Sequence, residues 1–72
     1  MVDISMLRQK IEESGISIAH IANVAKMDRS TFYRRLNASG SSFTVAEATA
    51  ISKALHLTSS EVASIFFTDT VA

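Results

Sequence analysis

The chain has 72 residues, no cysteine, and seven basic residues that balance seven acidic ones. A chain of this length forms one domain, and without cysteine it has no disulfide, no Cys-type zinc site and no thiol nucleophile. Asp3 and Arg8 interrupt the first apolar residues too early for a signal peptide, and no apolar run approaches the roughly 20 residues of a membrane span. We therefore expect one cytoplasmic domain over residues 1–72, with 68–72 as a flexible tail.

Apolar residues at helical spacing predict three helices in the first half of the chain. They begin after Asp3, Ser17 and Asp28, which are favoured N-cap residues. The first ends at Gly15, and the third runs to about residue 36. The residues expected to face inward are Ile4, Leu7 and Ile11, then Ile18, Ile21, Ala22 and Ala25, then Phe32 and Leu36.

Two capping boxes predict the last two helices. In Thr44–Glu47 and in Thr58–Glu61, the threonine and the glutamate can satisfy each other's backbone donors. The expected apolar stripes are Val45, Ala48, Ile51 and Leu55, then Val62, Ile65 and Phe66. The predicted fold class is all-α, a bundle of five helices.

The second and third helices are separated by a very short connection. Only Lys26 and Met27 remain between Ala25 and Asp28, so the two helices must meet at a steep angle, as in a helix-turn-helix. This connection and the helix after it also hold Lys26, Arg29, Arg34 and Arg35, with Asp28 as the one acid. The rest of the chain is net acidic, and such a polarised charge indicates a partner that is negatively charged.

The third helix carries the residue types that bind DNA. If Phe32 and Leu36 point inward, a rotation of 100° per residue places other side chains on the opposite face. These are Ser30, Tyr33, Arg34 and Asn37, with Arg29 and Arg35 at the margins. Arginine can bind guanine through O6 and N7 together, serine can pair with several base edges, and tyrosine or asparagine can hold phosphates.

Residues 7–67 resemble the lambda-repressor-like (Cro and repressor, or XRE-type) class of helix-turn-helix regulators. The matching stretches are LRQKIEESGIS, IAHIANVAKMDRSTFYRRLN and TVAEATAISKALHLTSSEV. The DRSTFYRRL helix and the IFF ending resemble short Cro-like or modulator-of-repression proteins of temperate phages of Gram-positive bacteria. The resemblance implies a transcriptional regulator of a phage genetic switch, which acts in the host cytoplasm and binds double-stranded operator DNA through its third helix.

Site residues follow from this resemblance and from the helical face. Base contacts are expected at Arg29, Ser30, Tyr33 and Arg34. Phosphate contacts are expected at Ser17, Lys26, Asn37, Ser39, Gly40 and Ser41. For Lys26 the alternative is a side chain that only faces water.

Three positions depart from the family pattern. Lys26 stands where a glycine is usual in the turn, so this position must tolerate an awkward backbone or the turn differs. Ile18 replaces a polar base-contacting residue. Arg35 stands where an apolar residue is common, and Leu36 takes over its role in the core.

A second hypothesis is an anti-repressor or modulator that binds a partner repressor and masks or alters its DNA binding. Zero net charge and the apolar Ile18 favour it, although Ile18 is also explained as a core residue. The candidate interface residues are Ile18, Tyr33, Arg35, Phe66 and Phe67. Phe66 and Phe67 are adjacent and cannot both face one narrow core, so the exposed one indicates a homodimer contact or loose packing.

An enzyme is the third hypothesis and the least supported. His20 and His56 lie on separate helices without a partner at metal-ligand spacing, and an N-cap role explains Asp28. We expect no catalysis, no metal and no cofactor.

Overall fold

The structure, a computed structural model, describes residues 2–38 and 43–67. Within these residues there are five helices and no strand, so the predicted all-α class is confirmed. The helices are α1 (Ile4–Ser14), α2 (Ile18–Val24), α3 (Arg29–Asn37), α4 (Val45–Ala54) and α5 (Ser59–Phe66). The predictions for Ser39, Gly40, Ser41 and the tail at 68–72 lie outside the described residues.

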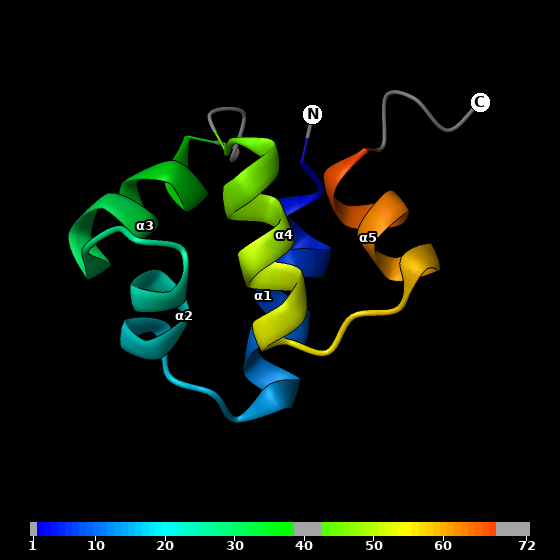
Figure 1. The fold of residues 1–72 in the computed structure, drawn as a ribbon, viewed down its shortest axis with the longest axis horizontal. Helices are drawn as coiled ribbons and strands as arrows, with labels where there is room; N and C mark the ends of the chain where they lie inside the picture. Colours follow the sequence, from blue (N-terminus) through cyan, green and yellow to red (C-terminus); the bar gives the residue numbers. More distant parts are fainter. Residues whose placement is uncertain (1, 39–42, 68–72) are drawn as a thin grey trace.

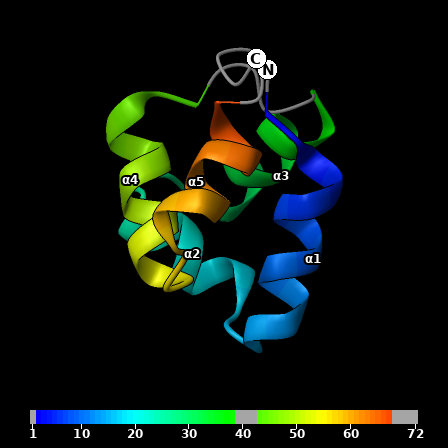
Figure 2. The same cartoon turned by 90° about the vertical axis from the view of Figure 1, so that its right-hand side faces the viewer.

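The helices surround one core. Figure 1 shows α4 in front of α1, with α2 and α3 on one side of this pair and α5 on the other. Figure 2, turned by 90°, separates α4 from α1 and shows α5 nearest the viewer. All five helices contribute buried residues, and the largest fully buried side chains are those of Leu7, Ile21, Phe32, Ile51 and Ile65. None of the helices in the described part of the chain is long and apolar enough to cross a membrane.

Every predicted N-cap is formed by the expected residue. The side chains of Asp3, Ser17 and Asp28 each accept a hydrogen bond from the backbone N–H three residues later. Thr44 and Thr58 form complete capping boxes. Each cap satisfies backbone donors that the first turn of a helix leaves without an intrahelical partner.

The two capping-box glutamates also connect distant helices. Glu47 accepts from the backbone N–H of Thr44 and forms an ion pair with Arg35 of α3. Glu61 accepts from the N–H of Thr58, and its other carboxylate oxygen lies 2.6 Å from Nζ of Lys10 on α1. Each carboxylate therefore both starts its own helix and fixes that helix to an earlier one.

One expectation about the apolar stripes is wrong, and one core residue was missed. Val45 is 71% exposed, although its spacing placed it in the core. Phe43, which precedes α4 and was not among the expected core residues, packs against the core, with its ring centroid 5.8 Å from that of Phe32 and 6.3 Å from that of Phe66. Phe66 is itself buried, so Phe67, which is 39% exposed, is the accessible member of the predicted interface pair.

Candidate nucleic-acid interface

The connection between α2 and α3 is a tight turn with a strained residue. Lys26 has a φ of 60°, in the left-handed region that glycine adopts most easily. The backbone N–H of Lys26 bonds to the carbonyl of Asn23, and that of Met27 bonds to the carbonyl of Ala22. This pair of hydrogen bonds is the Schellman motif that ends many helices, and it normally carries glycine at the position of Lys26. The awkward backbone expected at this position is therefore confirmed.

The first residue after this turn organises the start of α3. The Asp28 carboxylate accepts hydrogen bonds from the backbone N–H of Thr31 at 2.7 Å and from the hydroxyl of Ser30 at 3.0 Å. The bonds from Thr31 and Ser30, together with the nearby charge of Arg34, hold the pKa of Asp28 below its ordinary value. Asp28 is therefore a stable anion at the exposed tip of the helix.

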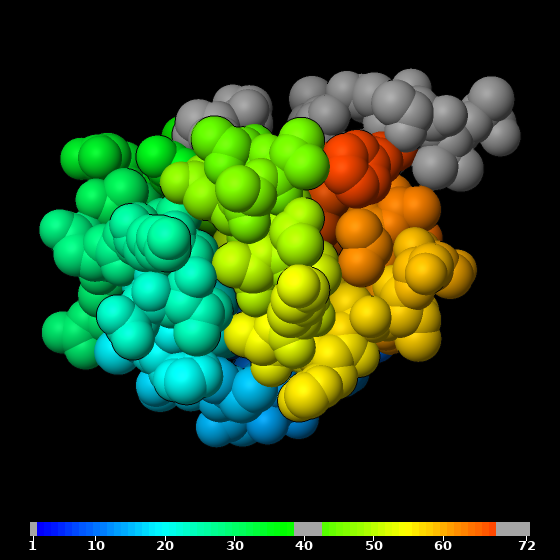
Figure 3. Space-filling view, in the orientation of Figure 1, coloured from blue at the N-terminus to red at the C-terminus, as the bar shows by residue number. Residues whose placement is uncertain are grey.

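The outward face of α3 carries the predicted base-contacting residues. Phe32 and Leu36 are buried, as expected from their spacing. Arg29, Ser30, Tyr33 and Arg34 are all exposed, and Tyr33 is 43% accessible. Figure 3 shows α2 and α3, in cyan and green, at the edge of the molecule away from α5. All four side chains are thus accessible on α3, while their contact with DNA stays a prediction.

Arg35 lies apart from this face. Its side chain is 26% exposed and pairs with Glu47, whose side chain is 18% exposed, across the contact between α3 and α4. The guanidinium therefore already has a carboxylate partner inside the fold, and the role of Arg35 in a protein interface stays a prediction.

The C-terminal end of α3 gains a basic residue that the sequence analysis missed. Asn37 is exposed, and its side-chain oxygen accepts a hydrogen bond of 3.0 Å from Nη2 of Arg8 on α1. No sequence pattern indicated this contact, because the two residues lie 29 positions apart. Arg8 therefore adds positive charge beside the predicted phosphate contact.

Ile18 and Tyr33 line a small groove between α1, α2 and α3. The groove has a volume of about 290 Å³, and its other lining residues are Arg8, Ile11, Glu12 and Leu36. Ile18 is half-buried and packs against the core. Both interpretations of Ile18 are thus compatible with its position, because it touches the core and also forms part of an accessible apolar wall.

The two other predicted phosphate contacts, Ser17 and Lys26, are exposed at opposite ends of α2. The hydroxyl of Ser17 accepts the backbone N–H of His20 at 3.1 Å, so its role as a cap is established by geometry. Lys26 lines a hollow between α2 and α4, which also contains Thr44 at the start of α4.

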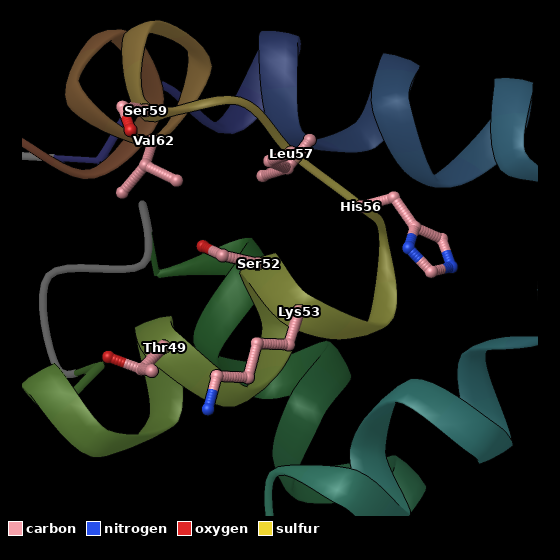
Figure 4. Close-up of a pocket in the computed structure, with 7 residues that line it drawn as sticks. All are labelled: Thr49, Ser52, Lys53, His56, Leu57, Ser59 and Val62. Carbon is pink, nitrogen blue, oxygen red and sulfur yellow. The ribbon is translucent and has the colours of Figure 1, made fainter.

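A separate hollow of about 420 Å³ lies between α4 and α5 (Figure 4). Ser52 and His56 both line it, which raises the question of a nucleophile and its base. The Ser52 hydroxyl donates to the carbonyl of Ala48 at 2.7 Å, and Figure 4 shows the His56 ring pointing away from Ser52. These two side chains are therefore not arranged as a catalytic pair.

Comparison of this chain with known protein families, with curated proteins and with solved structures gave no match.

Proposed function

We propose that this protein is a helix-turn-helix transcriptional regulator of the lambda-repressor-like class, in which α3 enters the major groove of operator DNA. The observation that carries the proposal is the exposure of Arg29, Ser30, Tyr33 and Arg34 on α3, a helix that buries Phe32 and Leu36 in the core. The short turn before α3 and the resemblance to phage switch regulators favour the same function. In this mode of binding, the second helix of the helix-turn-helix, here α3, contacts base edges through its N-terminal residues.

The proposal is tested by mobility-shift titration of the purified protein against the DNA upstream of its own gene, at two salt concentrations. We expect Arg29→Ala and Arg34→Ala each to weaken binding by about 1–3 kcal/mol and to relax specificity at one base pair. Lys53→Ala is the matched control, since Lys53 is an exposed basic residue on α4, outside the face of α3. If both arginine variants bind a selected operator as tightly as the wild type, the proposal fails.

The second candidate function is a modulator that binds a partner repressor. The specific observation in its favour is the groove lined by Ile18 and Tyr33, because an accessible apolar wall with charged residues at its edge is typical of a protein interface. The Arg35–Glu47 ion pair favours the same candidate, because Arg35 is then not available to neutralise a DNA phosphate.

Titration with the cognate repressor separates the two functions. A repressor complex that is abolished by Ile18→Ser, together with weak DNA binding by the protein alone, would favour the modulator. Absence of a complex at micromolar concentrations would exclude it. A homodimer is a further predicted assembly, and the exposed Phe67, directly after α5, is its candidate contact.

A further inference from the structure

The tip of α3, formed by the N-cap Asp28 and by Ser30, carries two hydrogen-bond acceptors. The hydrogen bond between these two side chains fixes which of them donates. An ionised carboxylate can only accept hydrogen bonds. The hydrogen between Ser30 and Asp28 must therefore come from the Ser30 hydroxyl, which donates to Oδ1 of Asp28 at 3.0 Å. The same oxygen accepts the backbone N–H of Thr31. The low pKa of Asp28 keeps this arrangement in place at neutral pH.

This bond decides what Ser30 can offer to a ligand. A free serine hydroxyl rotates and can donate or accept, which makes it a poor discriminator between bases. Here its one hydrogen is directed at Asp28, so the lone pairs of the oxygen remain for an outside partner. Both side chains are exposed, and they lie two residues apart in the first turn of the helix. The tip therefore presents acceptors, whereas Arg29 and Arg34 on the same helix present only donors.

We propose that Asp28 and Ser30 act together as a specificity-determining pair that selects an adenine or a cytosine at one position of the operator. This inference rests on the proposed insertion of α3 in the major groove. There, adenine N6 and cytosine N4 are the amino donors, whereas guanine O6 and thymine O4 are acceptors. An acceptor pair gains a hydrogen bond from an amino group and is repelled by a carbonyl oxygen.

The charge of Asp28 strengthens this assignment. A carboxylate beside a phosphate is repelled, so the negative tip is unfavourable against the DNA backbone and favourable against an amino edge. The arginines on the same face are suited to guanine. Asp28 and Ser30 at the tip would thus bind adenine or cytosine, and the arginines farther along α3 would bind guanine.

The test is in vitro selection of duplexes from a randomised library, followed by affinity measurements on the selected site. Asp28→Asn keeps an N-cap oxygen but replaces the second carboxylate oxygen with an amide donor, and Ser30→Ala removes the hydroxyl. Asp3→Asn makes the same chemical change at the N-cap of α1 and is the matched control. Circular dichroism and the melting temperature show that each variant is folded.

The expected result is a wild-type site with one position restricted to adenine or cytosine. Both tip variants should reduce discrimination at that position on the order of tenfold, leaving the guanine positions intact, and Asp3→Asn should have no effect. If the wild type selects a defined site and the tip variants select the same site with the same discrimination, this inference is overturned and the proposed function survives. If the wild type enriches no sequence at all, the proposed function fails, and the inference fails with it.

Discussion

Replacement of Lys26 by glycine tests two effects separately: the backbone strain at this residue and the contribution of its charge to DNA binding. Lys26 has a φ of 60° at the end of α2, where the Schellman motif favours glycine. A lysine in this conformation places its Cβ close to the following carbonyl oxygen. We expect Lys26→Gly to stabilise the fold and at the same time to weaken binding to DNA.

The size of the stabilisation follows from two opposing terms. Left-handed backbone costs an L-residue roughly 1–2 kcal/mol, and this cost disappears with glycine. Glycine loses more conformational freedom on folding than lysine does, and this loss offsets roughly 0.5–1 kcal/mol of the gain. The net gain is about 0.5–1 kcal/mol, or an increase of about 2–8 °C in the melting temperature of a domain of this size.

His56 supplies the matched control. It has a φ of 54° at the end of α4, with hydrogen bonds from His56 N–H to Lys53 and from Leu57 N–H to Ser52 that repeat the pattern around Lys26. His56→Gly should therefore raise the melting temperature by a similar amount. It should leave DNA affinity unchanged, because His56 lies between α4 and α5, outside the proposed interface.

Thermal unfolding followed by circular dichroism measures the first effect, and mobility shift measures the second. A lower melting temperature for Lys26→Gly would refute the strain argument. A higher melting temperature with unchanged DNA affinity would keep the strain argument and remove Lys26 from the phosphate contacts. Equal losses of affinity in Lys26→Gly and His56→Gly would show that the binding effect does not come from the lysine charge.

Two further predictions concern stability. Phe32→Ala should lower the free energy of unfolding by about 3–5 kcal/mol, a large part of the stability of a small domain, because Phe32 is fully buried. Val45 is exposed, so Val45→Ala is the control and should change the free energy of unfolding in urea by less than about 0.5 kcal/mol. The hydrogen bond between Lys10 and Glu61 lowers the pKa of Glu61 and raises that of Lys10, so the pair stabilises the fold above the ordinary carboxyl pKa of 4.5 and loses this effect as the pH falls further. Glu61→Gln should therefore melt below the wild type at pH 7, and the difference should shrink as the pH falls below 4.5. A difference that stays constant with pH would contradict the assignment.

The helix boundaries could be predicted because their causes are local. Each N-cap bond joins a side chain to a backbone N–H three residues away, so the residues at Asp28 and Thr58, for example, are sufficient to indicate where α3 and α5 begin. The spacing of Phe32 and Leu36 likewise defines the buried side of α3, and therefore the side that carries the candidate base contacts.

The errors and omissions involve contacts between distant residues. Val45 fits the apolar stripe of α4, but Phe43 provides the ring that packs between Phe32 and Phe66 at the core. Helical periodicity assigns a face to each residue, but it does not show which of two neighbouring apolar side chains the rest of the core accepts. The Arg35–Glu47 pair was missed for the same reason, since its partner comes from the next helix and not from α3 itself.

The charge that remains on the outward face determines how DNA binding should depend on salt. Of the basic residues in the turn and α3, Arg35 is paired with Glu47, which leaves Lys26, Arg29 and Arg34 exposed. If each of these three cations displaces one counterion from the DNA, whether it contacts a base or a phosphate, the slope of log affinity against log salt is about −2.7 for one bound copy and about −5.4 for two. Between 50 and 200 mM salt, one copy should thus lose about 40-fold in affinity and two copies roughly a thousandfold or more.

Titration at several salt concentrations, with the stoichiometry measured in parallel, tests this argument. A slope of about −2.7 per copy agrees with an interface confined to the turn and α3. A much steeper slope would mean that basic residues elsewhere, such as Arg8 beside Asn37, also contact the backbone. A slope near zero would contradict phosphate contact by this face, and the exposed arginines would then be better explained as a surface for an acidic protein partner.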